Sequence, residues 1–260
     1  MKANPSVLWK QLQSEAKAQV KKEPLLAKFL QDYILGHKKI SGGLASLLAN
    51  KLASPDLGTE KLNELFTGIY TKNPELDRLA LLDLAAVIER DPVGPSILQV
   101  YPFMKGFHAL QAHRLNHILW QQKRKTLAYY IQSRVSEIFA VDIHPAAKIG
   151  HNVMIDHATG VVIGETATVG NNVSMLHGVT LGGTGTHRGD RHPKVGDGVL
   201  LGAGSHLLGN IKIGTCAKIA VGSVVLKDVP AHTTVAGVPA KPICKTKGIP
   251  GKNMHQEIEE

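Results

Sequence analysis

The side chains best suited to chemistry lie at residues 155–160, where an aspartate directly precedes a histidine. Asp156 supplies a carboxylate, and His157 supplies an imidazole whose ordinary pKa suits a general base near neutral pH. This stretch interrupts a six-residue repeat that otherwise runs through the C-terminal half of the chain. Because core packing enforces such regularity, reactive side chains at a break favour a function. The alternatives are a buried, hydrogen-bonded histidine and a turn aspartate.

The six-residue repeat predicts the element that positions these side chains. Such a repeat is the signature of a parallel β-helix, in which each hexad forms a short strand with one inward side chain. Three hexads make a triangular coil, and stacked coils bury a continuous apolar column. Chance patterning in an ordinary β-sandwich would not hold phase this long. The inward residues are Ile149, Ile155, Ile163, Val169, Met175, Leu181, Val195, Leu201, Leu207, Ile213, Ile219 and Val225.

The repeat loses phase twice. Ile155 and Ile163 are eight residues apart, so two extra residues lie around the Asp-His pair. The second break follows Leu181, where thirteen residues without an inward aliphatic side chain must leave the coil as a loop. This loop contains Arg191 and His192, and a guanidinium matches a carboxylate bidentately. A mobile, glycine-rich surface loop is the alternative.

Residues 1 to about 140 have a helical period instead. Apolar residues recur at helical spacing over 25–34, 44–52, 62–69, 76–87 and 103–138, the last as one long helix. Proline and glycine lie at the expected ends of several of these stretches. The simplest explanation of the stripes is packing in the core or between subunits.

The composition of the 260 residues is that of an ordinary globular protein, with 43% hydrophobic and 20% charged residues. No run approaches the roughly 18 apolar residues of a membrane span, and the N-terminus lacks a signal-peptide core. We therefore expect a cytoplasmic protein without a membrane partner. Cys216 and Cys244 imply no disulfide framework. The net charge of +9 raises nucleic acid as a partner, but the basic residues are scattered and aromatics are only 5%.

Several motifs together resemble the serine O-acetyltransferases of the hexapeptide-repeat acyltransferase superfamily. They lie at residues 89–92, 105–112, 142–150, 156–160, 164–166, 179–185 and 189–194. The resemblance covers nearly the whole chain and implies an α+β fold. Its parts are an α-helical oligomerisation domain (1–140), a left-handed parallel β-helix catalytic domain (141–245) and a flexible C-terminal tail (246–260).

The resemblance implies acetyl transfer from acetyl-CoA to the hydroxyl of L-serine, the first step of cysteine biosynthesis. His157 would act as the base, and Asp142, fifteen residues earlier, would orient its ring. No nucleophile elbow is present, so direct attack in a ternary complex is expected. Four side chains would hold the serine zwitterion, two at its ammonium and two at its carboxylate: Asp91 and Asp156, and Arg191 and His192.

The resemblance also implies that acetyl-CoA lies along a groove between coils and that no metal is needed. Small residues would allow a close backbone approach, and lysines would meet the phosphates. The residues concerned are Gly183, Gly202, Ala203 and Gly222, with Lys218 and Lys241. Glycines occur in every coil and surface lysines are usually solvated, so scaffold roles compete with these assignments.

Members of the superfamily form trimers with sites between neighbouring β-helices, and serine acetyltransferases often pair two trimers. L-cysteine is implied as a feedback inhibitor at the serine site. Many bacterial members end in an isoleucine that inserts into O-acetylserine sulfhydrylase. Here Ile258 is followed by two glutamates, so that partnership is not expected.

Other functions stay open on the sequence alone. A related acetyltransferase could use homoserine, an antibiotic or a sugar, although the helical domain argues against the sugar enzymes. A γ-type carbonic anhydrase would need three histidines to converge on zinc, from among His151, His157, His177 and His192. A non-catalytic scaffold predicts no loss of activity when His157 is removed. Asp91 could simply cap a helix that starts at Pro92.

Overall fold

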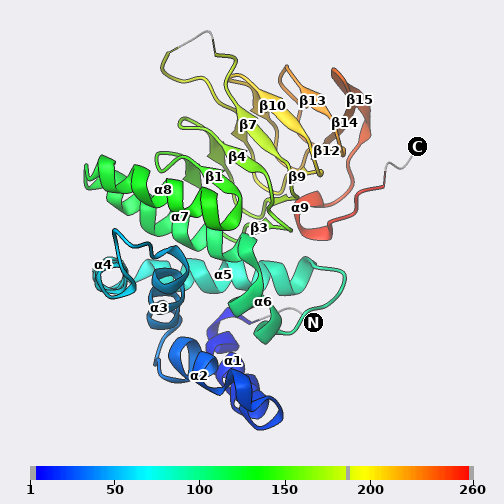
Figure 1. Ribbon diagram of the computed structural model, residues 1–260. Helices are drawn as coiled ribbons and strands as arrows, with labels where there is room; N and C mark the ends of the chain where they lie inside the picture. Colours follow the sequence, from blue (N-terminus) through cyan, green and yellow to red (C-terminus); the bar gives the residue numbers. More distant parts are fainter. Residues whose placement is uncertain (1–3, 186–187, 258–260) are drawn as a thin grey trace.

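The computed structural model describes residues 4–185 and 188–257. Helices form the first half of this part and short strands the second (Figure 1). The elements of the first half are α1 (Pro5–Lys22), the 3₁₀ turn η1 (Pro24–Leu26), α2 (Ala27–Leu30), the π-helical turn η2 (Gln31–Leu35), α3 (Ile40–Leu52), α4 (Thr59–Lys72), α5 (Glu75–Arg90), α6 (Ile97–Phe103), α7 (Lys105–Gln121) and α8 (Lys125–Phe139). The long helix expected over 103–138 is instead broken before α7 and again at Lys123, whose φ is +62°.

The second half is a parallel β-helix with three faces. One face contains β1 (Val141–Ile143), β4 (Val161–Ile163), β7 (Thr180–Gly182), β10 (His206–Leu208) and β13 (Val224–Val225). The second contains β2 (Lys148–Ile149), β5 (Thr168–Val169), β8 (Lys194–Val195) and β11 (Lys212–Ile213). The third contains β3 (Met154–Ile155), β6 (Ser174–Met175), β9 (Leu200–Leu201), β12 (Lys218–Ile219), β14 (Thr233–Gly237) and the antiparallel β15 (Ala240–Lys245). The predicted order of helices and β-helix is confirmed.

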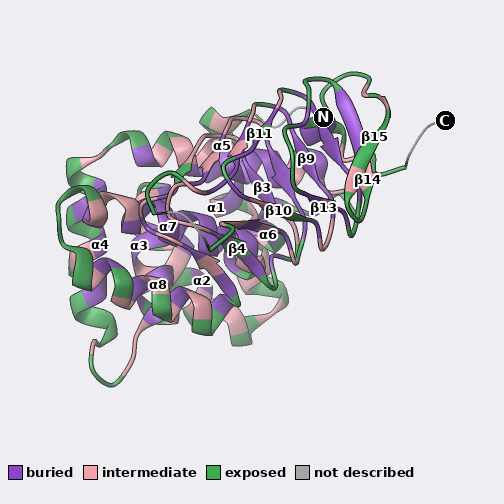
Figure 2. Cartoon of the chain, turned by 90° about the horizontal axis from the view of Figure 1, so that it is seen from above, coloured by how far each residue is buried: buried purple, intermediate pink, exposed green. Residues whose placement is uncertain are grey.

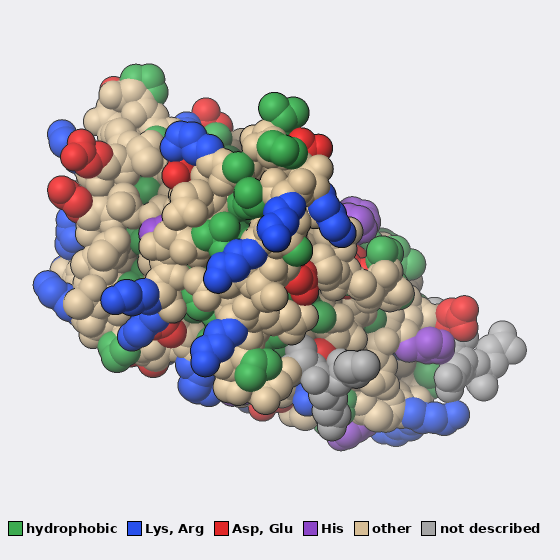
Figure 3. Space-filling model, turned by 90° about the horizontal axis from the view of Figure 1, so that it is seen from below, with side chains coloured by type: hydrophobic (Ala, Val, Ile, Leu, Met, Phe, Trp, Pro, Cys, Tyr) green, Lys and Arg blue, Asp and Glu red, His purple; other side chains and the backbone are tan. Residues whose placement is uncertain are grey.

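The apolar column forms as the hexads predict. Of the twelve predicted inward residues, eleven are buried and Ile149 is half-buried. In Figure 2 the buried residues, in purple, run through the coils and along the inward faces of the helices. Among the described residues, no helix is long and apolar enough to cross a membrane. Lys and Arg side chains are dispersed among neutral and acidic ones on the face in Figure 3.

The residue offsets between paired strands give the size of both breaks in the repeat. A regular coil is 18 residues, the offset between Val162 and its partner Thr180. The offset from Val141 to Val161 is 20 residues, which places two extra residues in the first coil. The offset from Thr180 to His206 is 26, so the long loop adds eight. In Figure 1 this loop extends outward from the coil.

A buried carboxylate fixes the helices on the first coil. Asp83 of α5 is fully buried, and its Oδ2 accepts hydrogen bonds from Gln111 Nε2 at 2.9 Å and Arg114 Nε at 2.8 Å, both on α7. Its Oδ1 accepts from the backbone N–H of Val153 at 3.0 Å. Arg114 Nη2 also donates to the Gly150 carbonyl at 2.7 Å. One ion pair thus joins two helices and the first coil.

The C-terminal segment differs from the flexible tail expected over 246–260. Within its described part, α9 (Pro250–Asn253) packs on the coil with Pro250 and Gly251 buried. Farther on, the buried ammonium of Lys218 donates to the carbonyls of His255 and Glu257 at 3.2 and 2.6 Å. The amino-acid composition of the tail could not predict these contacts, because they are made by backbone carbonyls.

We predict that Asp83→Ala lowers the free energy of unfolding by about 3–5 kcal/mol, because it leaves the buried Arg114 cation without its anion. Glu64→Ala is the matched control, since Glu64 is an exposed acidic residue within α4. It should change stability by no more than about 0.5 kcal/mol. Urea unfolding would measure both, and equal losses would contradict the assignment.

Candidate active site

The Asp-His stretch forms a left-handed turn between two coil faces. His157, Ala158 and Gly160 have φ values of +54°, +63° and +77°. Two successive non-glycine residues in this region store backbone strain, which is typical of functional sites. The His157 side chain is 74% exposed, and its Nε2 lies 3.7 Å from Asp156 Oδ2. Its ring centroid is 5.8 Å from that of His177. The turn therefore presents an imidazole beside a carboxylate.

The N-terminus of α7 holds this turn in place. A Cβ on Gly106 would lie 2.0 Å from the Ile155 carbonyl oxygen and 3.2 Å from the Ala158 methyl, so only glycine allows the helix to approach so closely. Next to it, Lys105 Nζ donates to Thr159 Oγ1 at 2.5 Å. The motif at 105–112 thus contributes the support for the strained turn.

A cleft of about 280 Å³ opens between these elements. Three candidate residues, Asp91, Asp156 and His157, contribute to its lining, and we name it the acidic cleft. Its other walls come from α5, α6, α7 and β3: Val87, Phe103, Met104, Lys105, Gly106, Phe107, Met154 and Ile155. Carboxylates on a partly apolar cleft suit an organic cation, and an adjacent base suits proton abstraction.

Asp91 follows the last residue of α5 and does not cap a helix that starts at Pro92. Its Oδ1 accepts a hydrogen bond from the Val93 N–H at 3.0 Å within a turn. The next helix, α6, begins at Ile97, and Ser96 forms its capping box. The capping alternative is therefore wrong, and the Asp91 carboxylate belongs to the cleft.

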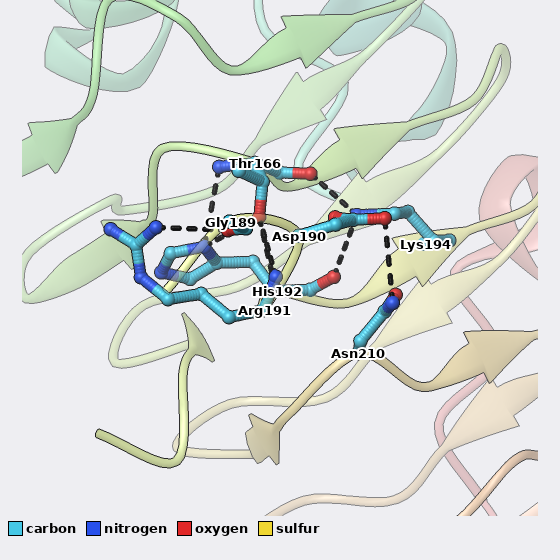
Figure 4. A network of polar contacts seen from close by, with 7 residues as sticks. All are labelled: Thr166, Gly189, Asp190, Arg191, His192, Lys194 and Asn210. Carbon is cyan, nitrogen blue, oxygen red and sulfur yellow. Dashed lines mark hydrogen bonds and ion pairs between the residues drawn. The ribbon is translucent and has the colours of Figure 1, made fainter. Parts of the chain in front are cut away.

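Thr166 organises the second group of candidate residues (Figure 4). Its Oγ1 accepts hydrogen bonds from the backbone N–H groups of Arg191 and His192 at 3.0 and 3.1 Å. The Thr166 N–H donates to His192 Nδ1 at 3.2 Å, and Oγ1 lies 2.9 Å from the same nitrogen. Because Nδ1 accepts, the neutral ring carries its proton on Nε2. Burial, followed by the Arg191 charge, lowers the pKa of His192 and favours this neutral form.

Further contacts anchor the end of the loop, and we name residues 188–194 the basic loop. Arg191 Nη2 is 2.8 Å from Glu165 Oε2, and this hydrogen bond lowers the pKa of Glu165. Lys194 Nζ pairs with Asp190 and donates to the Thr166 carbonyl at 2.6 Å. These bonds argue against a freely mobile loop in its described part. Glu165 and Thr166 lie in the motif at residues 164–166, but the sequence alone assigned neither of them a role.

His192 also needs Gly164, the first residue of this motif. A Cβ on Gly164 would lie 2.0 Å from His192 Cδ2 and Nε2, so the ring rests on the Gly164 backbone. The need for glycine at position 164 could not be seen in the sequence, because Gly164 and His192 lie on different coils.

The two groups lie at opposite ends of β4. The strained turn leads into Val161, whereas Glu165 and Thr166 follow Ile163. One chain thus separates the acidic cleft from the basic loop. Asp142 lies in β1, opposite Val162, and its Oδ1 accepts from Gln132 Nε2 at 2.6 Å. Within the described part of one chain, no hydrogen bond or ion pair joins Asp142 to His157, contrary to the expected pair. Asp142 is aligned with Val162, five residues beyond His157, so a spacing of fifteen residues does not bring the two side chains together within one chain, and their pairing stays a prediction.

The glycines proposed for the coenzyme have mixed surroundings. A Cβ on Gly202 would lie 2.6 Å from the Val221 N–H, so coil stacking alone explains this glycine. Gly183 packs against Arg191 of the basic loop, at 3.3–3.5 Å from a built Cβ. Gly222 has a φ of +67° and open space around it, and its N–H donates to the Ala203 carbonyl at 2.8 Å.

The two lysines proposed for the coenzyme phosphates also differ. Lys241 is exposed on β15. Lys218 is only 7% exposed, and its ammonium donates to the tail carbonyls described above. The Lys218 ammonium is therefore not free for a phosphate in this structure, because it is buried under the tail and donates to two of its carbonyls.

The histidines of the zinc alternative do not converge. His157 and His177 are neighbours, but His192 lies beyond the other end of β4, in contact with Thr166. Among the described residues, no three or more His, Cys, Asp or Glu side chains form a group that could hold a metal. This arrangement gives no support to a three-histidine site within one chain.

Comparison with known proteins agrees with this geometry. Residues 8–112 match the family model "Serine acetyltransferase, N-terminal", and residues 192–227 match "Bacterial transferase hexapeptide (six repeats)". The serine acetyltransferase of Haemophilus influenzae is 49% identical over 250 residues, which are 96% of this chain and 94% of that protein.

Solved structures show the same relationship. A serine acetyltransferase in complex with cysteine has a TM-score of 0.96 and 47% identity, covering 98% of this chain and 100% of that one. The Brucella abortus serine acetyltransferase in complex with coenzyme A has a TM-score of 0.91 and 48% identity, covering 94% and 97%. The chain therefore belongs to the serine acetyltransferase family, a family of hexapeptide-repeat acyltransferases.

Proposed function

We propose that the acidic cleft carries out the family's reaction, the transfer of an acetyl group from acetyl-CoA to the hydroxyl of L-serine. The products are O-acetyl-L-serine and CoA, and the reaction begins cysteine biosynthesis from serine. The observation that carries this proposal is the meeting of Asp91, Asp156 and His157 in one cleft. It puts a base beside two anions that can bind the ammonium of an amino acid.

His157 is the proposed general base. Its imidazole takes the proton of the serine hydroxyl while the oxygen attacks the thioester carbonyl. The tetrahedral intermediate then collapses, the C–S bond breaks, and the imidazolium returns the proton to the CoA thiolate. The Asp156 carboxylate lies 3.7 Å from Nε2 of this ring. The Asp142 carboxylate accepts a hydrogen bond from Gln132, and its role in orienting the His157 imidazole stays a prediction.

The carboxylate of serine requires the basic loop. Arg191 offers a bidentate fork, and neutral His192 offers its Nε2–H. Because these groups lie at the other end of β4, we propose that the basic loop of a neighbouring copy completes each site. We therefore propose a homotrimer in which each pair of neighbouring copies shares one site. Whether two trimers associate stays a prediction.

Acetyl-CoA is proposed to lie along the corner of the coil that begins at the strained turn. Glycines with positive φ recur there at one position of successive coils: Gly160, Gly178, Gly204 and Gly222. With Ala203 beside them, they leave backbone open to an extended pantetheine arm. The coenzyme A complex of the Brucella abortus relative supports CoA as the leaving group.

L-cysteine is proposed as an inhibitor at the same site. It has the ammonium and carboxylate of serine, with a thiol in place of the hydroxyl, and a related enzyme is known in complex with cysteine. Cytoplasmic location stays a prediction, and Ile258, on which the question of a sulfhydrylase partner rests, lies outside the described residues.

The decisive assay mixes the protein with acetyl-CoA and a panel of acceptors and follows the released thiol. The panel contains serine, homoserine, threonine, a galactoside and an aminoglycoside. Serine should have the highest kcat/KM. A better acceptor among the others would reject serine as the substrate.

We predict that His157→Ala lowers kcat by about 10²- to 10⁴-fold, because the serine hydroxyl loses its base. His151→Ala is the control, since His151 is a half-buried histidine of the same coil. It should retain near-wild-type turnover, whereas a zinc enzyme that used it would not. Thiol release at saturating substrates measures both, with size-exclusion chromatography to verify assembly. Near-wild-type turnover of His157→Ala would exclude it as the base.

We predict that co-assembly of two inactive variants restores activity. In each mixed trimer of His157→Ala and Arg191→Ala, one of the three seams between copies would contain both intact residues, so about a third of wild-type activity should return. As a control, mixing His157→Ala with Asp91→Ala should restore nothing, because both changes damage the acidic cleft. Co-expression with two affinity tags isolates the mixed trimers. Recovery in neither mixture would mean that the site is not shared.

A further inference from the structure

The C-terminal helix α9 makes an unusually close contact with the coil. The Gly251 N–H donates to the Gly198 carbonyl at 2.8 Å. A Cβ on Gly251 would lie 2.3 Å from the Asn172 carbonyl oxygen and 2.7 Å from that of Val199. No larger residue fits here without a shift of α9. This helix borders β6, β9 and the end of α5 (Figure 1).

A buried hydroxyl connects α9 to α5. Ser174 in β6 is fully buried, and its Oγ donates to the Gly251 carbonyl at 2.6 Å. The same Oγ accepts from Arg90 Nη1 at 3.0 Å. A serine hydroxyl has one hydrogen and two lone pairs, so both bonds can form together. Gly251, Ser174 and Arg90 therefore form a relay of two hydrogen bonds.

Arg90 is sensitive to the loss of any of these contacts. It is only 5% exposed, and its guanidinium also donates to the carbonyls of Asn152 at 2.9 Å and Val173 at 3.3 Å. The hydrogen bonds of this buried cation in the described structure thus go to neutral oxygens, and burial of a charge is costly unless such bonds are well placed. Arg90 is the last residue of α5, and Asp91 of the acidic cleft follows directly.

We propose that Arg90 is a positioning residue for Asp91 and that α9 completes its support. The relay fixes the end of α5 on the second coil and so fixes the carboxylate that meets the acceptor's ammonium. The inference rests on the proposed function, in which Asp91 binds that ammonium. The C-terminal segment then contributes to acceptor affinity from the far side of α5, without contact with the acceptor.

Ser174→Ala tests the relay with the smallest change. We expect the KM for serine to rise about fivefold, as for the loss of one ordinary hydrogen bond, while kcat and the KM for acetyl-CoA stay within about twofold. The control is Ser205→Ala, because Ser205 is equally buried in the coil but its Oγ has no hydrogen-bond partner among the described residues. That variant should leave all three constants unchanged. Thermal unfolding would confirm that both variants are folded.

Two further measurements distinguish positioning from general loosening. Gly251→Ala, which displaces α9, should raise the KM for serine similarly, and its combination with Ser174→Ala should add little. In an Asp91→Asn background, which has already lost the anion, Ser174→Ala should have no further effect on the KM for serine.

An unchanged KM for serine in Ser174→Ala would overturn the proposal, as would an equal rise in the KM for acetyl-CoA. Full additivity with Asp91→Asn would also overturn it. Failure of the proposed function would look different, since the wild-type chain itself would then not acetylate serine.

Discussion

The buried Asp83–Arg114 pair is the interaction on which the acidic cleft depends. Asp83 holds two side chains of α7 with one oxygen and the backbone of the first coil with the other. Since α5 runs on to Asp91 and α7 begins beside the strained turn, the pair sets the separation of the cleft walls. Each partner satisfies the other's buried charge, so neither helix can shift without leaving an uncompensated ion.

The cleft itself arises where two structural periods meet. A helical surface repeats every 3.6 residues and a coil every 18, so the two surfaces cannot match over a long distance. Gly106 permits one close contact, at the Ile155 carbonyl, and the two extra residues after it bend away from the coil. The strain in His157 and Ala158 is tolerated because α7 supports the turn that contains them.

The sequence predicted the order of helices and coils and both breaks, because inward side chains every six residues have no other simple explanation. It also singled out Asp91, Asp156 and His157, which share a cleft. It could not reveal Thr166 as the support of His192, or the tail on Lys218, because those bonds join residues distant in the chain. The Asp142–His157 contact is likewise not formed within the described part of one chain. Spacing predicts which residues stack, but β1 aligns Asp142 with Val162, beyond the extra residues.

The separation of charges along β4 has a physical advantage for an enzyme that binds a zwitterion. If Arg191 and Asp156 faced each other within one chain, they could pair directly and close the empty site. Here Arg191 instead pairs with Glu165, at an arginine-to-carboxylate distance of 2.8 Å. That pair is partly exposed, so exchanging Glu165 for the carboxylate of an acceptor costs little. Glu165 thus occupies Arg191 and keeps it from pairing with the aspartates of the acidic cleft until the carboxylate of an acceptor replaces it.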